Sequence, residues 1–268
     1  MKNQTFRLIT ALLAFLFLLT GCSQQQAAEP ESTKPASTEA MPAEPVTDAY
    51  RGEWTATTGE TYTYAIPKID LPGEYTEKVN DKIFALYREK LSDEGELHLA
   101  ADYSYESYVC RDLLSVVLRI AYPEQLTQGE DFSVASQHYV YTLHLSDGSE
   151  ATPEEVLTLA GVAPEEFYEH VSAALGNAFC LSLSEDLLQD CLSEDTPTSP
   201  EAVLPWFSDT ISVDNAKAAL PYLNENGELF FVGTVYQIAG AVSHTRLLPY
   251  AREEEISPYY EALLELTQ

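Results

Sequence analysis

The stretch that decides the fold is His138-Tyr-Val-Tyr-Thr-Leu-His-Leu-Ser-Asp-Gly148, followed closely by Thr152-Pro-Glu-Glu155. In the first part, side chains of two kinds alternate, so the tyrosines fall on one face of a strand and the histidines on the other. Asp-Gly favours a turn at the end of that strand. The second part is a capping box with proline at the first helical position, so a helix begins there. A strand that leads within a few residues into a helix indicates a chain of mixed structure.

The segments on either side extend this pattern. Upstream, we predict strands at residues 61–69, 98–109, 113–122 and 133–145, with an amphipathic helix at residues 74–90 between the first two. Downstream come further short helices, and then Asn226-Gly227 between two apolar runs, which is a hairpin signal. Because most strands follow one another directly, we expect an α+β fold, an antiparallel sheet with helices packed on one face.

The N-terminal segment has the layout of a secretory signal. Lys2 and Arg7 precede an apolar run at residues 8–19, and Leu-Thr-Gly-Cys22 follows. The ending resembles a bacterial lipobox, which implies that residues 1–21 are a lipoprotein signal peptide and that Cys22 is lipidated. The alternative is an uncleaved transmembrane helix, but this run is short of the roughly 20 residues that a spanning helix needs. We therefore predict attachment to the bacterial cell membrane by lipid, on its extracytoplasmic face.

Residues 22–49 differ in composition from the rest of the chain. From residue 23 they contain four prolines, many polar or small residues, and no aromatic residue, Leu, Ile or Phe. Such a segment buries too little apolar surface to offset the entropy of ordering it. We predict a disordered tether at residues 22–49 and a single α+β extracytoplasmic domain at residues 50–268.

The charge balance excludes some classes of partner. The chain has 14 Lys and Arg against 43 Asp and Glu, a formal net charge of −29. This argues against nucleic acid, whose phosphates require cationic side chains, and against docking on anionic lipid. It is compatible with a cationic protein, with metal ions, or with solubility alone.

No catalytic motif stands out in the sequence. There is no Gly-x-Ser-x-Gly, phosphate-binding glycine loop, His-Glu-x-x-His or Cys-x-x-Cys, so we expect no cofactor and no metal site. His138 and His144 share a face but lie about 20 Å apart along a strand, too far to bind one ion together. Cys180 and Cys191 could pair only if the helix between them breaks.

Four tyrosines are the remaining candidates for binding: Tyr103, Tyr105, Tyr139 and Tyr141. Tyrosine is favoured at recognition surfaces because it joins an apolar ring to a polar hydroxyl. Alternate positions of a strand also face the core, so the four side chains either line an exposed surface or pack beneath a helix.

From about residue 103 to residue 250 the order of these features resembles the RsiV-like domain-of-unknown-function family. The carrying features are the tyrosine-rich strand at 103–108, Leu-Ser-Val-Val-Leu at 114–118, the quoted strand, and Asn-Gly-Glu-Leu before an aromatic strand at 226–231. The family occurs outside the cell in lysozyme-sensing anti-sigma factors and peptidoglycan deacetylases. The resemblance implies non-catalytic sensing or binding at the cell envelope.

Two hypotheses on function follow. The first is a cell-envelope lipoprotein whose domain is not an enzyme and binds a cationic protein such as lysozyme, or a wall component. The second is an envelope hydrolase that acts on peptidoglycan or a peptide, which would require His98, His138 or His244 to meet a carboxylate in the fold.

Overall fold

The computed structural model describes residues 44–93, 95–122, 136–193, 200–237, 243–251 and 256–267. The chain separates into two units, Met1–Met41 and Pro42–Gln268, and every described residue belongs to the second. The predicted signal peptide, Cys22 and residues 22–43 of the predicted tether lie outside the described residues. What the sequence predicts for them therefore stays a prediction.

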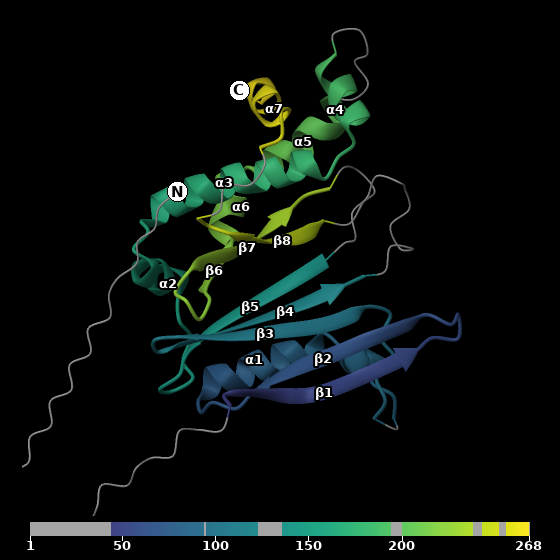
Figure 1. Ribbon diagram of the computed structural model, residues 1–268, viewed down its shortest axis with the longest axis vertical. Coiled ribbons are helices and arrows are strands. Elements are labelled where there is room, and N and C mark those ends of the chain that lie inside the picture. The colour runs from purple at the N-terminus through teal and green to yellow at the C-terminus, as the bar shows by residue number, and fades with distance from the viewer. Residues whose placement is uncertain are drawn as a thin grey trace, which may run out of the picture. The chain divides into compact units, whose positions relative to one another are not determined.

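Five strands form the first sheet, in the order β1-β2-β3-β4-β5 (Figure 1). Their bounds are Val46–Thr55, Thr61–Ile69, Asp102–Cys110, Leu113–Ala121 and Ser136–His144. Three of the four strand pairs are antiparallel, but β2 and β3 run parallel, with Tyr64 opposite Tyr103. The predicted α+β fold is confirmed, and the predicted antiparallel pairing holds for every described strand pair except this one. The cause is helix α1 (Glu74–Ala85), which follows β2 and precedes β3 in the sequence. It crosses over the sheet and returns the chain to the end at which β2 began.

A second, antiparallel sheet has the order β6-β7-β8, with bounds Leu220–Leu223, Leu229–Val235 and His244–Pro249. The predicted hairpin between its first two strands is confirmed. Gly227 has φ +77°, a left-handed conformation that glycine adopts without steric cost. The side-chain oxygen of Asn224 accepts hydrogen bonds from the backbone N–H groups of Asn226 and Glu228, which fixes the turn.

Of the remaining described helices, five lie between β5 and β6 in the chain, and the sixth follows β8. They are α2 (Pro153–Ala160), α3 (Pro164–Leu181), α4 (Glu185–Leu192), α5 (Pro200–Thr210), α6 (Val213–Ala218) and α7 (Tyr260–Leu266), and a short 3₁₀ turn, η1 (Arg88–Lys90), follows α1. The capping box predicted at the start of α2 is confirmed, because the Thr152 hydroxyl accepts from the N–H of Glu155 while the Glu155 carboxylate accepts from the N–H of Thr152.

Three apolar clusters arrange these elements in layers. Val79 and Ile83 of α1 pack against one face of the five-stranded sheet. Val117, Val140, Tyr222 and Val232 fill the space between the two sheets. Helices α2, α3 and α6 cover the far side of the three-stranded sheet, with α3 lying along it, and α4, α5 and α7 pack against other helices (Figure 1). Each sheet thus carries helices on one face and meets the other sheet with its second face.

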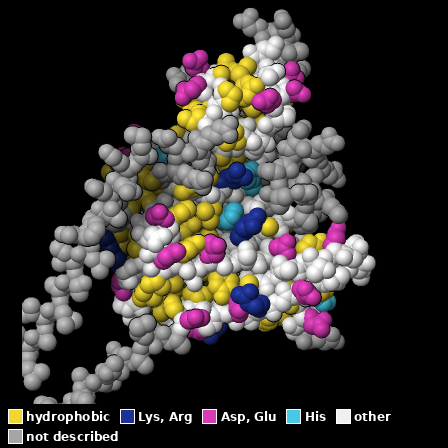
Figure 2. Space-filling view, in the orientation of Figure 1, with side chains coloured by type: hydrophobic (Ala, Val, Ile, Leu, Met, Phe, Trp, Pro, Cys, Tyr) yellow, Lys and Arg dark blue, Asp and Glu magenta, His cyan; other side chains and the backbone are white. Residues whose placement is uncertain are grey.

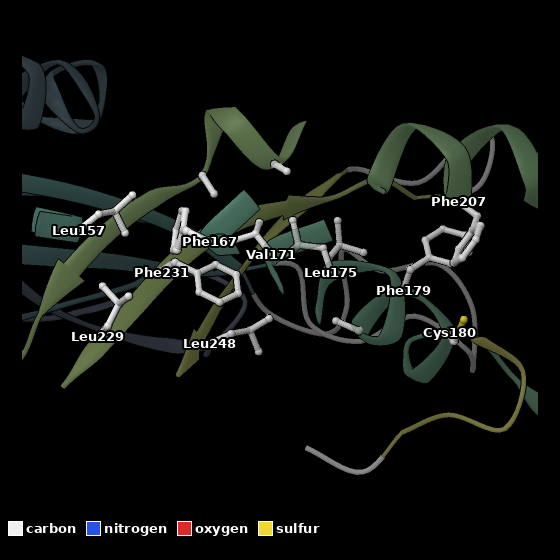
Figure 3. Packing of buried hydrophobic residues seen from close by; sticks show 14 of the residues in the cluster. Leu157, Phe167, Val171, Leu175, Phe179, Cys180, Phe207, Leu229, Phe231 and Leu248 are labelled. Carbon is white, nitrogen blue, oxygen red and sulfur yellow. The ribbon is translucent and has the colours of Figure 1, made fainter. Parts of the chain in front are cut away.

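The cluster beneath these helices, here called the helical core, is rich in phenylalanine (Figure 3). Phe167 of α3 meets Phe231 of β7 edge to face, with ring centroids 5.8 Å apart. Phe179 of α3 and Phe207 of α5 pack at 5.7 Å. All four side chains are fully buried, so these rings stabilise the region through apolar area and ring contacts.

No strand is predicted from the sequence where β1 lies, because the first predicted strand is at residues 61–69. Residues 46–49 were predicted as the end of the tether, but they are the start of β1. Val46 is buried and lies opposite Ile69 of β2. Local composition could not reveal this strand, because only the pairing with β2 and the burial of Val46 order it. The described fold therefore begins before residue 50.

Candidate functional site

The register of the central strands gathers all four candidate tyrosines on one face of the sheet. Tyr105 of β3 and Tyr139 of β5 both lie opposite Leu118 of β4, one on each side of it. Tyr103 and Tyr141 occupy the same face further along their strands, because side chains two residues apart point the same way. This face is the one that α1 partly covers.

Two tyrosines that the sequence analysis did not single out join this set. Tyr75 of α1 lies near Tyr141, and Tyr122, just after β4, lies near Tyr139; both pack at the border of the same apolar cluster. The alternation of Leu118, Ile120 and Tyr122 was a signal for the second of them. We call the six side chains the tyrosine face: Tyr75, Tyr103, Tyr105, Tyr122, Tyr139 and Tyr141.

The six side chains differ in burial. Tyr103 is buried, and its hydroxyl donates to the carbonyl of Leu86 just after α1, at 3.4 Å, so it is a core residue. The other five are only partly buried. Tyr105 donates to Asp48 at 3.0 Å, and Tyr75 donates to Glu150 at 3.1 Å. The tyrosine face is thus a border between the core and solvent.

Burial sets the ionisation of this face. It raises the pKa of Tyr103 to about 12, and the neighbouring phenols Tyr122 and Tyr139 add to the shift. Burial, followed by the phenol of Tyr139, raises the pKa of Tyr141 to about 12 as well. The pKa of Tyr139 is raised for the same reasons, burial first and Tyr122 second. These phenols stay neutral and protonated at physiological pH, so they offer rings and O–H groups for binding.

The histidines give no sign of a catalytic group on this face. His98 stacks on Trp54, with ring centroids 5.3 Å apart, and its Nε2 lies 3.7 Å from the carboxylate of Glu96. His170 packs against Tyr250 at 4.4 Å, while the Tyr250 hydroxyl donates to Glu166. Neither grouping includes one of the six tyrosines.

His144 is the histidine with two carboxylates beside it. Its Nδ1 lies 3.5 Å from Asp112, and its Nε2 lies 3.7 Å from Glu155. The nearby hydroxyl of Ser146 donates to Asp112 and not to the imidazole. A nucleophile activated by a histidine needs a hydrogen bond between the two. In the described part of the chain, this group is therefore a set of polar contacts at the end of β5 with no nucleophile beside the imidazole.

The hydrolase hypothesis required His98, His138 or His244 beside a carboxylate. His98 has the carboxylate of Glu96 beside it, but both side chains are exposed. His138 and His244 lie near each other at the meeting point of β5 and β8. Their charged neighbours are arginines: Arg119 and Arg246 act on His138, and Arg246 acts on His244. The fold thus brings these two histidines together, but it places arginines beside them and not the carboxylate that the hydrolase hypothesis required.

Cysteines and metal ligands add no further site within the described residues. Cys110, Cys180 and Cys191 are free thiols. Burial raises the pKa of Cys180 to about 12, so its reactive thiolate form is suppressed. Across the described ranges, no group of three or more His, Cys, Asp or Glu side chains is placed to hold a metal ion.

Comparisons with known proteins leave the family open. No protein-family model, curated protein or solved structure matches the chain. The resemblance to the RsiV-like family therefore stays a prediction from the sequence. Among the helices that the structure describes, none has the length and apolar character required to cross a membrane.

Proposed function

We propose that the chain is a lipid-anchored protein on the extracytoplasmic face of a bacterial cell membrane, and that its folded domain binds a ligand through the tyrosine face without catalysing a reaction. The single observation that carries the binding part is the convergence of five partly exposed tyrosines on one side of the sheet. Tyrosine supplies a large, rigid contact area and a hydrogen-bonding hydroxyl at a low cost in side-chain entropy.

Charge favours a cationic partner, such as a lysozyme or a basic segment of another envelope protein. The chain has a net charge of −29, which attracts cations over a long range. At the face itself, Tyr75 lies against the carboxylate of Glu150, and aromatic rings bind cationic side chains through their faces. A neutral wall fragment would use the rings alone and would bind with little dependence on salt.

The binding experiment uses residues 42–268, which form one compact unit. Lysozyme and soluble peptidoglycan fragments are titrated against this unit by calorimetry at about 50 mM and 500 mM salt. We expect saturable binding of lysozyme that weakens at the higher salt, because exposed charges are screened within a Debye length of about 10 Å at 0.1 M.

Variants locate the surface. Tyr139→Ala and Tyr141→Ala each remove a partly exposed ring and should weaken binding about tenfold or more, the cost of a hot-spot residue. Tyr168→Ala on α3 is the matched control, because it removes a partly buried tyrosine that packs against the helical core, and it should leave affinity unchanged. Equal losses in all three variants would contradict the tyrosine face, and release of products from the wall fragments would favour the hydrolase hypothesis.

The anchor has its own test in cells fed labelled palmitate. The label should enter the chain, and Cys22→Ala should abolish labelling and release the protein from the membrane fraction. Labelling that survives Cys22→Ala would contradict lipidation at this residue.

A further inference from the structure

The two sheets are joined edge to edge by side chains where β5 meets β8. Both are edge strands of their sheets. The Thr245 hydroxyl of β8 accepts from the backbone N–H of His138 at 2.6 Å, and it also lies 3.0 Å from the Nδ1 atom of His138. Gln137 donates from its side-chain amide to the carbonyl of Ser243 at 2.9 Å. The contacts join β5 to β8, and the one with Thr245 positions the His138 ring.

Two arginines stand beside this contact. Arg119 of β4 lies directly opposite His138 in the strand register and is exposed. Arg246 of β8 lies near enough to His138 and His244 to lower the pKa of both rings, although burial is the larger cause for each. We call the group Arg119, His138, His244 and Arg246 the β5–β8 junction.

The junction departs from the charge of the rest of the protein. The chain carries 43 acidic residues, yet neither arginine forms an ion pair with a carboxylate of the described residues. Figure 2 shows basic and histidine side chains gathered side by side in the middle of the visible face, where β8 passes β5. A local excess of positive charge in an acidic protein is suited to an anion.

A buried donor provides an independent observation. His244 is 2% exposed, and the side-chain nitrogen of Gln237 lies 2.7 Å from its Nδ1. An amide nitrogen donates, so Nδ1 accepts and the proton of the neutral ring is on Nε2. That Nε2 atom is buried and has no hydrogen-bond partner among the described residues. Buried polar groups are almost always satisfied in native proteins, so this N–H calls for an acceptor.

We propose that the β5–β8 junction is a binding site for an oxyanion, that is, for the carboxylate or phosphate group of a small ligand. Guanidinium groups bind such groups through paired, charge-assisted hydrogen bonds, and an imidazole N–H adds a further donor. Arg119 and His138 lie on the face of β4 and β5 opposite to Leu118 and Tyr139. The site is therefore separate from the tyrosine face and does not rest on the proposed function.

The test uses the full-length chain in detergent, titrated with inorganic phosphate and with acetate at constant ionic strength, with chloride as the reference anion. Binding is followed by the nuclear magnetic resonance signals of the histidine rings. We expect the His138 and His244 signals to shift saturably with either oxyanion, while those of His98 and His170 do not move. If the ring signals shift saturably with phosphate but not with acetate, the site binds phosphate groups and not carboxylates. Absence of a saturable shift with both anions would overturn the proposal.

Arginine variants provide the second readout. Arg119→Gln and Arg246→Gln should each weaken oxyanion binding about tenfold, the loss of one charge-assisted pair. Arg88→Gln is the matched control, because Arg88 is an exposed arginine of η1 on the α1 side of the five-stranded sheet, and it should bind like the unaltered chain. Equal binding by all three variants would mean a general salt effect and would overturn the site. If a junction variant fails to fold, the titration of the unaltered chain, followed by its histidine ring signals, decides whether the oxyanion site exists.

Discussion

The helical core and the tyrosine face are both aromatic, but they differ in what the aromatic side chains can do. In the helical core, Phe167 and Phe231 are fully buried and meet only apolar groups and rings. On the other outer side of the molecule, tyrosine takes the place of phenylalanine, and Tyr139 and Tyr141 remain partly exposed. A phenylalanine cluster supplies stability alone, whereas a half-buried tyrosine supplies stability through its ring and leaves its hydroxyl for a partner.

The largest effect is expected in the helical core. Phe231→Ala removes a ring that is fully buried, and it should lower the free energy of unfolding by about 3–5 kcal/mol. Urea denaturation measures the change. Phe84→Ala on α1 is the control, because Phe84 is 43% exposed, and it should cost less than about 1 kcal/mol. Similar costs for both would show that the helical core is not the main source of stability.

The second effect concerns the turn that holds α1 beside the tyrosine face. Gly148 has φ +67°, and a Cβ added there would lie 1.8 Å from the carbonyl oxygen of Pro72. Gly148→Ala should cost about 3 kcal/mol, since the left-handed conformation and the overlap both oppose it. Gly59→Ala is the control, because φ is +92° there but no atom lies within 4 Å. Its cost in urea denaturation should be only about 1–2 kcal/mol, and an equal cost for both would exclude the overlap as a cause.

Alkaline pH should weaken the fold in part through the tyrosine face. The folded pKa of Tyr103 and Tyr141 is raised to about 12 from 10, so the unfolded chain loses these protons first. Their stabilising effect is complete below pH 10 and is lost as the pH rises through 12. Urea denaturation at pH 8 and pH 11 measures the loss, which the double variant Tyr103→Phe/Tyr141→Phe should reduce. An unchanged loss in that variant would assign the alkaline sensitivity to other groups.

The smallest effect on stability is expected from Tyr141→Phe, which removes only a hydroxyl. No hydrogen bond joins this hydroxyl to another described residue, so the free energy of unfolding should change by less than about 0.5 kcal/mol. Lysozyme affinity, in contrast, should fall several-fold if the hydroxyl bonds to the partner. Urea denaturation measures the change in stability, and calorimetry on the same protein sample measures the change in lysozyme affinity. A large loss of stability with unchanged affinity would make Tyr141 a core residue like Tyr103.

The local elements could be predicted from the sequence because each depends on residues that are close together in the chain. The capping box at Thr152 and Glu155 and the turn at Asn226-Gly227 are formed as expected. The alternation in β3 and β5 correctly placed Tyr103 and Tyr105 on one face of their strand, and Tyr139 and Tyr141 on one face of theirs. Chain periodicity fixes such features with little reference to the rest of the fold.

Only the tertiary structure decided which of these faces meet. The parallel pairing of β2 with β3, the ordering of Val46 in β1 and the division into two sheets all depend on contacts between distant segments. The same holds for Arg119 and Arg246, which are 127 positions apart in number yet flank the same histidine. Burial between layers, and not local propensity, determines these contacts, because the apolar area removed from water is a property of the assembled fold.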